Sequence, residues 1–346
     1  MNTISTVSFV GAPRSTVERA RRDLVDAQVE ATSGRHVDVG LELGARIGEV
    51  LLLRGQGVEL EGLRKSSEMV AGRLEVTQSA LSSLVADAND MISGLVAARS
   101  NRSAQQTSPV QAGGYLKSFR TLMNTAYNGA HVFGGINVDV EPIADYFSDP
   151  TSSMRASVQA AFVSHFGFAP DDPAASSITA TDLSVFINGD FEALFNDPGW
   201  QNLSSASNSN LQDRIASDEI VTTSTNANAQ EFRNLAKAYI MVTEFGGGQL
   251  SDSAFEYLAD TATGNLSQSI DGIGVTQSNL GFAQERVSFS LRIQEETSIF
   301  MKTRVGELED VDAYEVATRL NTITAALEAS YAITARIQRL SLLEYV

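Results

Sequence analysis

The chain has 346 residues, no cysteine and a formal charge of −17, from 42 acidic and 25 basic residues. The lack of cysteine excludes disulfides, thiolate nucleophiles and cysteine metal sites. The acid excess disfavours nucleic acids and anionic membranes as partners, because both carry negative charge. No stretch approaches the roughly 18 uncharged apolar residues of a spanning helix, so we expect no membrane insertion.

The prolines are concentrated in the middle of the chain. Five of the seven are Pro142, Pro150, Pro170, Pro173 and Pro198. Proline inside a helix costs about 3 kcal/mol, so the nearly proline-free flanks permit long helices. Both flanks also carry apolar residues at heptad-like spacing. The sequence therefore predicts a mostly α protein in which helices from the two chain ends enclose an inserted domain.

The first predicted helix has a narrow apolar seam of mostly small residues. Its members are Val17, Ala20, Leu24, Ala27 and Ala31. Steps of three and four along this seam are typical of one helix face. Gly34 follows as a helix stop, and we expect a glycine-dotted turn or loop over residues 34–48 before the next helix.

The next predicted helix has the strongest periodicity of the chain. Its seam is Leu60, Leu63, Ser67, Val70, Leu74, Thr77, Leu81, Leu84, Ala88, Met91, Leu95 and Ala98. A sustained 3.5-residue repeat is typical of a coiled coil. An amphipathic helix on a globular core has the same pattern and stays an alternative.

A break is expected over residues 101–109, followed by a third helix over 110–127. The dipeptides at 128–129 and 134–135 are Asn-Gly and Gly-Gly, which are turn signals. They close the N-terminal part of the chain.

The predicted insert covers residues 136–213. It contains eleven acidic residues and one basic residue, Arg155, together with most of the prolines and the single tryptophan, Trp200. We expect helices over 152–165 and 180–195 in a small α+β domain that faces solvent.

The chain then returns through an extended segment over residues 214–226. Asn228 and Glu231 have the spacing of a helix N-cap and its capping box. A helix follows and ends at the glycines 246–248. A second very long helix is expected over 253–308, with several polar residues in its seam, and a last helix begins after Asp310 or Asp312.

No constellation of residues predicts catalysis. His36, His131 and His165 have no histidine or acidic neighbour at metal-ligand spacing, so we interpret them as structural or surface residues. The glycines at 246–248 lack the Lys-Ser/Thr sequence of a phosphate loop. We interpret Trp200 as a packing residue of the insert. The sequence predicts no enzyme, no cofactor and no metal site.

Motifs at both ends of the chain resemble the flagellin family. They are Ala31-Thr32-Ser33-Gly34-Arg35, His131-Val132-Phe133-Gly134-Gly135, Leu308-Glu309-Asp310-Val311-Asp312, Ala317-Thr318-Arg319-Leu320-Asn321 and Leu327-Glu328-Ala329-Ser330-Tyr331. The ending over residues 335–346 is similar to that of the family's hook–filament junction subunits. One departure is the family's Pro-Ser-Asp-Asp-Pro loop, which is absent after Arg35, and the insert resembles nothing that we can place.

The resemblance implies three layers. Residues 1–40 and 310–346 form an inner coiled coil, residues 41–135 and 214–309 form a long-helix domain, and residues 136–213 form the solvent-facing insert. The assembly interface expected from this comprises Val17, Leu24, Ala31, Leu320, Ile323, Leu327, Tyr331, Ile337, Leu340, Leu342 and Leu343.

The resemblance also implies a role and a location. We expect an adaptor that joins the flagellar hook to the filament, contacts another junction protein and flagellin subunits, and self-associates in a ring or helical layer. Export through the flagellar type III channel, with an export chaperone and no cleaved signal peptide, implies an extracellular location. The alternatives are a filament subunit and a signalling coiled-coil hairpin, which the central insert disfavours.

The terminal helices are expected to have low stability in the isolated subunit. Each large side chain buried along the last helix contributes about 1.5–3 kcal/mol. Ordering the backbone costs roughly 1–2 kcal/mol per residue, which offsets most of that gain. We therefore expect the chain ends to be loosely folded in the free subunit and to fold fully against neighbouring subunits.

Overall fold

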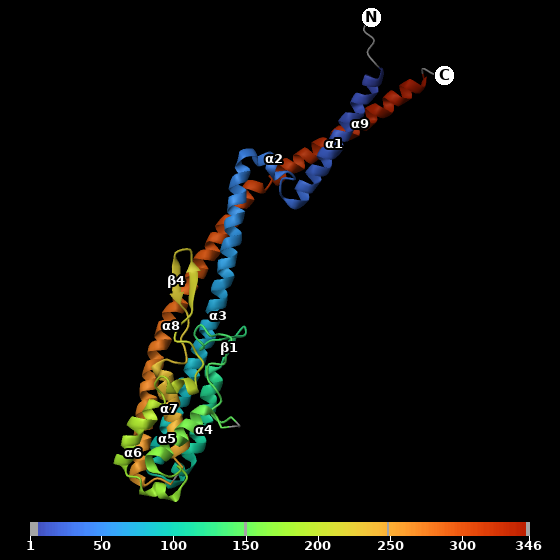
Figure 1. Cartoon of the computed structure of the whole chain (residues 1–346). Helices are drawn as coiled ribbons and strands as arrows, with labels where there is room; N and C mark the ends of the chain where they lie inside the picture. Colours follow the sequence, from blue (N-terminus) through green and yellow to red (C-terminus); the bar gives the residue numbers. More distant parts are fainter. Residues whose placement is uncertain (1–5, 149–150, 248, 344–346) are drawn as a thin grey trace. The chain divides into compact units, whose positions relative to one another are not determined.

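A computed structural model (Figure 1) describes residues 6–148, 151–247 and 249–343. Side chains are described between residues 15 and 336. The chain forms two compact units, residues 1–62 with 294–346 (unit 1) and residues 63–293 (unit 2). The main helices are α1 (Thr6–Ser33), α3 (Ile47–Ala98), α4 (Arg102–Met123), α5 (Ser153–Phe166), α7 (Gln230–Phe245), α8 (Asp252–Glu309) and α9 (Ala313–Leu343). The described residues are mostly α-helical, with two short antiparallel hairpins at the borders of the insert, which confirms the predicted fold class.

The seam predicted for the second helix faces the core of unit 2. Every seam position from Ser67 to Ala98 on α3 is buried, including the polar Ser67 and Thr77. The apolar side chains of the seam belong to one continuous core with residues of α4, α7 and α8. This part of α3 therefore packs on a globular core, which is the alternative that the sequence left open.

The loop expected over residues 34–48 contains ordered turns. A short helix, α2 (Val39–Leu43), and a 3₁₀ turn, η1 (Gly44–Arg46), precede α3. The side chain of Asp38 caps α2 by accepting a hydrogen bond from the amide of Leu41 at 2.8 Å. The prediction of a turn or loop did not include the short helix α2, which forms because a single capping carboxylate is enough to start one turn.

The break expected over 101–109 is much shorter in the structure. Helix α4 begins at Arg102 and contains Pro109 in its interior. Asn101 caps it by accepting hydrogen bonds from the amides of Ser103 and Ala104 at 3.0 and 3.3 Å. Proline removes one helical hydrogen bond, but Ala112, Leu116 and Phe119 of the same helix are buried, so packing offsets that loss.

The predicted turns after α4 form a hairpin and a tight loop. Strands β1 (Ala126–Tyr127) and β2 (Ala130–His131) pair antiparallel around Asn128 and Gly129, which both have positive φ. The third helix therefore ends at Met123, four residues before the predicted end. Gly135 also has positive φ, and a Cβ there would lie 2.5 Å from the carbonyl oxygen of Ser209. The Gly-Gly pair is thus required where this loop meets the end of the insert.

The insert has an aromatic core that is continuous with α7. Helix α5 begins after the N-cap Ser152, close to the predicted start. Helix α6 (Ala180–Phe186) continues as a π turn over Ile187–Phe191, so the predicted helix over 180–195 is shorter and less regular. The rings of Phe162 and Phe245 stack with centroids 5.1 Å apart, which anchors α5 on α7.

A second hairpin follows the insert and lies on the long helices of unit 2. Strands β3 (Gln212–Ala216) and β4 (Glu219–Thr222) pair antiparallel, as expected for an extended return segment. Arg73 of α3 pairs with Asp213 and donates a hydrogen bond to Thr223 at 2.8 Å. Ser290 of α8 donates to the carbonyl of Ile215 at 2.5 Å.

The capping box predicted at Asn228 and Glu231 does not form. The N-cap of α7 is Ala229, which makes no side-chain cap hydrogen bond. The Asn228 side chain instead accepts hydrogen bonds from the Trp200 indole at 2.8 Å and the Ser204 hydroxyl at 2.6 Å. Glu231 accepts one from Thr276 of α8 at 2.6 Å. Both side chains bond to residues distant in the sequence and not to the backbone at the start of α7. The spacing of Asn228 and Glu231 in the sequence does not reveal these partners.

Candidate functional site: the paired terminal helices and their joint

Unit 1 is built around the helices from the two chain ends. Helices α1 and α9 lie side by side (Figure 1). Arg21 of α1 donates a hydrogen bond to the Tyr331 hydroxyl of α9 at 2.8 Å. Nearer the other end of the pair, Glu30 of α1 forms an ion pair with Arg319 of α9. These two contacts make the pair antiparallel.

The predicted assembly residues divide into three groups along this pair. Leu327 is buried, Val17, Leu24, Leu320 and Ile323 are half-buried, and Ala31 and Tyr331 are exposed. The side chains of Ile337, Leu340, Leu342 and Leu343 lie outside the described residues. Ala27 and Val316 are also buried between the helices, although they were not among the predicted interface residues.

The loop after α1 is bonded to the turn between α8 and α9. Arg35 and Asp310 form an isolated antiparallel bridge. The amide of His36 donates to the carbonyl of Glu309 at 3.1 Å, and the amide of Val311 donates to the carbonyl of Gly34 at 3.0 Å. Residues 34–37 and 309–311 therefore form one joint, which we call the terminal joint.

A buried carboxylate lies at the centre of the terminal joint. The side chain of Glu309 is only 1 % exposed. It accepts a hydrogen bond from the Arg54 guanidinium of α3 at 2.7 Å, and Arg35 lies 3.8 Å away. A buried carboxylate requires such partners, because an unpaired buried charge is strongly destabilising. Glu309 thus ties α3 and the loop after α1 to the last residue of α8.

A second carboxylate, that of Glu30, contacts residues 36 and 37 of the terminal joint. Glu30 accepts a hydrogen bond from the amide of Val37 at 3.2 Å and lies 3.6 Å from the His36 ring. Nearby, Arg304 of α8 pairs with Glu49 of α3 at 3.0 Å. The carboxylates of Glu307 and Glu49 raise the pKa of Arg304 by accepting hydrogen bonds from it. Charge pairs therefore connect α1 to α9 and α3 to α8.

Unit 1 buries few large side chains of its own. Its buried apolar residues, within the described part, are Ala27, Val50, Leu308, Val316 and Leu327. Its exposed large apolar residues are Val25, Val29, Val37, Leu41, Leu51, Leu52, Val58, Ile299, Phe300, Tyr314, Tyr331 and Ile333. Unit 1, within its described residues, therefore exposes more large apolar side chains than it buries.

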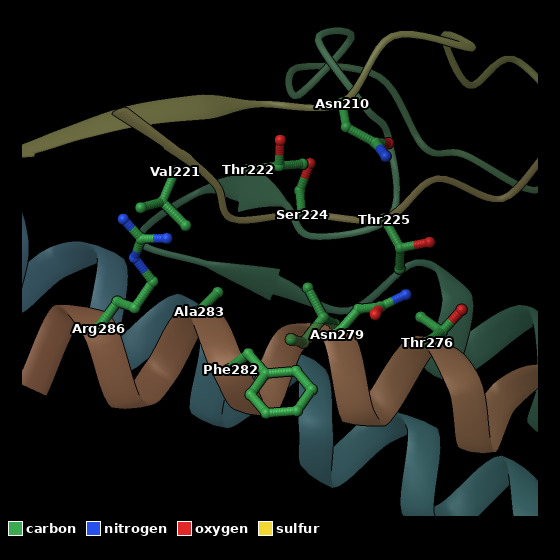
Figure 2. A pocket seen from close by; sticks show the side chains of 11 residues that line it. Asn210, Val221, Thr222, Ser224, Thr225, Thr276, Asn279, Phe282, Ala283 and Arg286 are labelled. Carbon is green, nitrogen blue, oxygen red and sulfur yellow. The ribbon is translucent and has the colours of Figure 1, made fainter. Parts of the chain in front are cut away.

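An open groove of unit 2 lies between its second hairpin and α8. Figure 2 shows Val221 and Thr222 of β4 on one side and Phe282, Ala283 and Arg286 of α8 on the other. The groove has a volume of about 430 Å³. Its other lining residues are hydroxyl, amide and aliphatic side chains, namely Asn210, Ser224, Thr225, Thr276, Asn279 and Leu280. Arg286 is held by Glu219 at 2.7 Å, and the lining offers no nucleophile with a base beside it.

Comparison with protein families matches both ends of the chain. Residues 4–138 match the bacterial flagellin N-terminal helical region, and residues 263–346 match the bacterial flagellin C-terminal helical region. The chain belongs to the flagellin family. A comparison with curated proteins found no match.

Membership of the flagellin family identifies the general role of the chain. The chain is a structural subunit of the bacterial flagellum, of the kind that self-associates into extracellular flagellar assemblies. The terminal joint is formed from one loop of each matched region, residues 34–37 and 309–311. The sequence motifs 31–35 and 308–312 marked these segments, but they did not reveal that the segments are bonded to each other.

The histidines have structural partners in this flagellin-family chain. The Nδ1 atom of His131 donates to the carbonyl of Asn124 at 2.8 Å, and that of His165 lies 2.8 Å from the Asp190 carboxylate. Among the described residues, no group of three or more His, Asp or Glu side chains has the arrangement of a metal site. Across the same residues, no helix has the length and apolar character needed to cross a membrane.

Proposed function

We propose that this flagellin-family chain is the adaptor that joins the flagellar hook to the filament, a subunit of the hook-associated protein 3 type. The observation that carries an assembly role is the composition of unit 1, whose helices expose many large apolar side chains and bury few. Such a unit is completed by packing against other subunits. The junction role rests on the ending over residues 335–346, which resembles that of junction subunits.

Each of the three layers has a different part in the assembly. Residues 1–40 and 310–346 form the inner contacts, residues 41–135 and 214–309 the long-helix layer, and residues 136–213 the solvent-facing insert. The apolar seams of α1 and α9 carry the inner contacts, through the residues predicted for the interface. The partners are another junction protein, flagellin subunits and further copies of the chain.

The chain reaches the assembly by export and folds there. The chain is exported unfolded through the flagellar type III channel, with an export chaperone bound before export. The terminal helices fold fully only against neighbouring subunits, since helices that bury few large side chains are marginal alone. Rapid protease cleavage of both chain ends in the free subunit is the expected result, and resistance of both ends would contradict this part.

The decisive experiment is deletion of the gene for this chain, with electron microscopy of the cells and assay of filament protein in the medium. We expect hooks without filaments and filament protein shed into the medium. Intact filaments of altered composition would assign the chain to the filament itself, the alternative within the family. Normal flagella of unchanged composition would contradict both roles.

A point variant tests the interface without removing the chain. Ile333 of α9 is 59 % exposed, so Ile333→Glu should leave the free subunit folded while it places a charge in the apolar contact. Val163→Glu is the matched control, because Val163 of α5 is 43 % exposed and lies in the proposed solvent-facing insert. Only the first variant is expected to impair motility.

A further inference from the structure

The first part of α3, residues 47–62, has two different apolar faces. One face is covered within unit 1, where Val50 is buried and Ile47, Leu53 and Leu60 are half-buried. The other face carries Leu51, Leu52 and Val58, which are 63, 61 and 75 % exposed. A helix that is apolar on two faces is typically packed on both. Among the described residues of unit 1, nothing covers the second face.

Three glycines on this exposed face are one heptad apart. They are Gly48, Gly55 and Gly62, and each is exposed. A Cβ atom built at any of the three would have no heavy atom within 4 Å. Glycine weakens a helix relative to alanine, and the described residues of the chain make no close approach that requires glycine here. We call Gly48, Leu51, Leu52, Gly55, Val58 and Gly62 the glycine face.

The heptad spacing indicates what covers the glycine face. A second helix meets the first at intervals of seven residues, and large side chains of one helix fill the holes of the other. Glycine enlarges those holes and lets the two backbones approach closely. Large exposed side chains at matching intervals lie on α8 of the same sequence: Ile293 and Phe300 are one heptad apart and 47 and 67 % exposed, with Ile299 beside them at 55 %.

We propose that the glycine face of α3 in one subunit binds the exposed face of α8 around Phe300 in a second copy of the chain. The two surfaces differ, so the contact is heterologous. A heterologous contact joins each copy to the next and builds a ring or an open helix, whereas two identical patches would stop at a dimer. The inference rests on the proposed structural role and adds to it the surfaces that join the subunits.

Cysteine cross-linking in flagella tests the contact, because the chain has no native cysteine. The double variant Leu51→Cys with Phe300→Cys, which places a smaller side chain on the glycine face and leaves its glycines intact, is produced in cells in place of the original chain. Purified flagella are then oxidised and separated under non-reducing conditions. We expect a ladder of dimers, trimers and larger species, which dithiothreitol collapses to the monomer.

The two single variants are the controls. In a heterologous contact, Leu51→Cys alone and Phe300→Cys alone give no ladder and no disulfide dimer. Dimers from Leu51→Cys alone would overturn the proposal in favour of contact between two glycine faces. If the double variant is incorporated into flagella and gives no ladder, the proposed contact is wrong while the structural role stands. If the original chain is absent from purified flagella, the structural role fails as well.

A second measurement separates the contact from the stability of the subunit. Gly55→Ala should raise the melting temperature of the purified subunit by about 2 °C, because alanine favours helix. The same variant should lower incorporation into flagella at least severalfold, because the added methyl groups block the close approach. Gly264→Ala on α8 is the control, since Gly264 is also exposed with open space around it. It should raise the melting temperature without lowering incorporation, and equal incorporation of both variants would overturn the proposal.

Discussion

The carboxylate of Glu309, at the end of α8, accepts a hydrogen bond at 2.7 Å from Arg54 of α3, a residue 255 positions earlier in the chain. The contact joins two long helices at the terminal joint, where residues 34–37 and 309–311 bond to each other. Glu309 is almost fully buried, whereas the Arg54 side chain is 55 % exposed. The carboxylate therefore depends on the arginine more than the arginine depends on the carboxylate.

Arg54→Ala should loosen the terminal joint by about 1–3 kcal/mol, because it leaves the buried Glu309 carboxylate with Arg35 alone. The expected result is faster hydrogen exchange, by roughly tenfold, at the amides of His36 and Val311, which bond across the joint. Arg46→Ala, an exposed arginine eight residues earlier, is the control and should leave both rates unchanged. Equal rates in all three proteins would show that Arg54 does not stabilise the joint.

Two glycines of α8, only two residues apart, should respond to alanine with opposite signs. A Cβ at Gly272 would lie 2.8 Å from the Cβ of Glu231 on α7, whereas a Cβ at Gly274 would have open space. Gly272→Ala should therefore destabilise unit 2 by about 1–3 kcal/mol through overpacking. Gly274→Ala should stabilise it by up to about 1 kcal/mol. Thermal unfolding followed by circular dichroism measures both, and shifts in the same direction would contradict the packing of α7 on α8.

The heptad seam of α3 could be predicted because each part of the pattern lies within one helix. From Ser67 to Ala98, every position that the 3.5-residue period predicted is buried, and Ala80 is buried in addition to them. The terminal joint could not be predicted in this way. Glu309 appears in the sequence as an ordinary acid of a family motif, and its burial depends on arginines that only the fold brings near.

The errors at Pro109 and Asn228 have the same origin. Local rules place a break before Pro109 and start the third helix after it, yet α4 begins at Arg102 and continues through the proline, supported by the Asn101 cap and by buried side chains on both sides of the proline. Local rules also make Asn228 an N-cap, yet its side chain bonds to Trp200 and Ser204 of the insert. Tertiary contacts outweighed local preference at both places.

Asn228→Ala should loosen the insert, because it leaves the Trp200 indole N–H and the Ser204 hydroxyl without their acceptor. Each lost acceptor costs about 1–3 kcal/mol when the donor stays buried. Trp200 is 1 % exposed and is the single tryptophan of the chain, so its fluorescence reports the change directly. We expect a red-shifted emission maximum and unfolding at a lower urea concentration. Asn196→Ala is the control, since Asn196 is exposed and bonds only within its own turn.

Two buried tyrosines should make the subunit sensitive to high pH. Burial, followed by the charge of the Glu244 carboxylate, raises the pKa of Tyr146, and burial followed by the charge of Asp87 raises the pKa of Tyr239. In the unfolded chain both hydroxyls titrate near pH 10. Each tyrosine therefore has a higher pKa in the folded subunit than in the unfolded chain. The stability that this difference contributes is fully present below about pH 10 and is lost as the pH rises further.

The free energy of unfolding should therefore fall above pH 10, by about 1.4 kcal/mol for each pH unit and each tyrosine that stays protonated. Tyr239→Phe is the informative variant because its hydroxyl is buried without a hydrogen-bond partner and its ring stacks on Tyr115 at 5.9 Å. Phenylalanine keeps the ring, so stability at pH 7 should be equal or higher while the alkaline loss becomes less steep. Urea unfolding at pH 7, 9 and 11 measures both effects. An unchanged alkaline slope in Tyr239→Phe would show that Tyr239 ionises as readily in the folded subunit as in the unfolded chain.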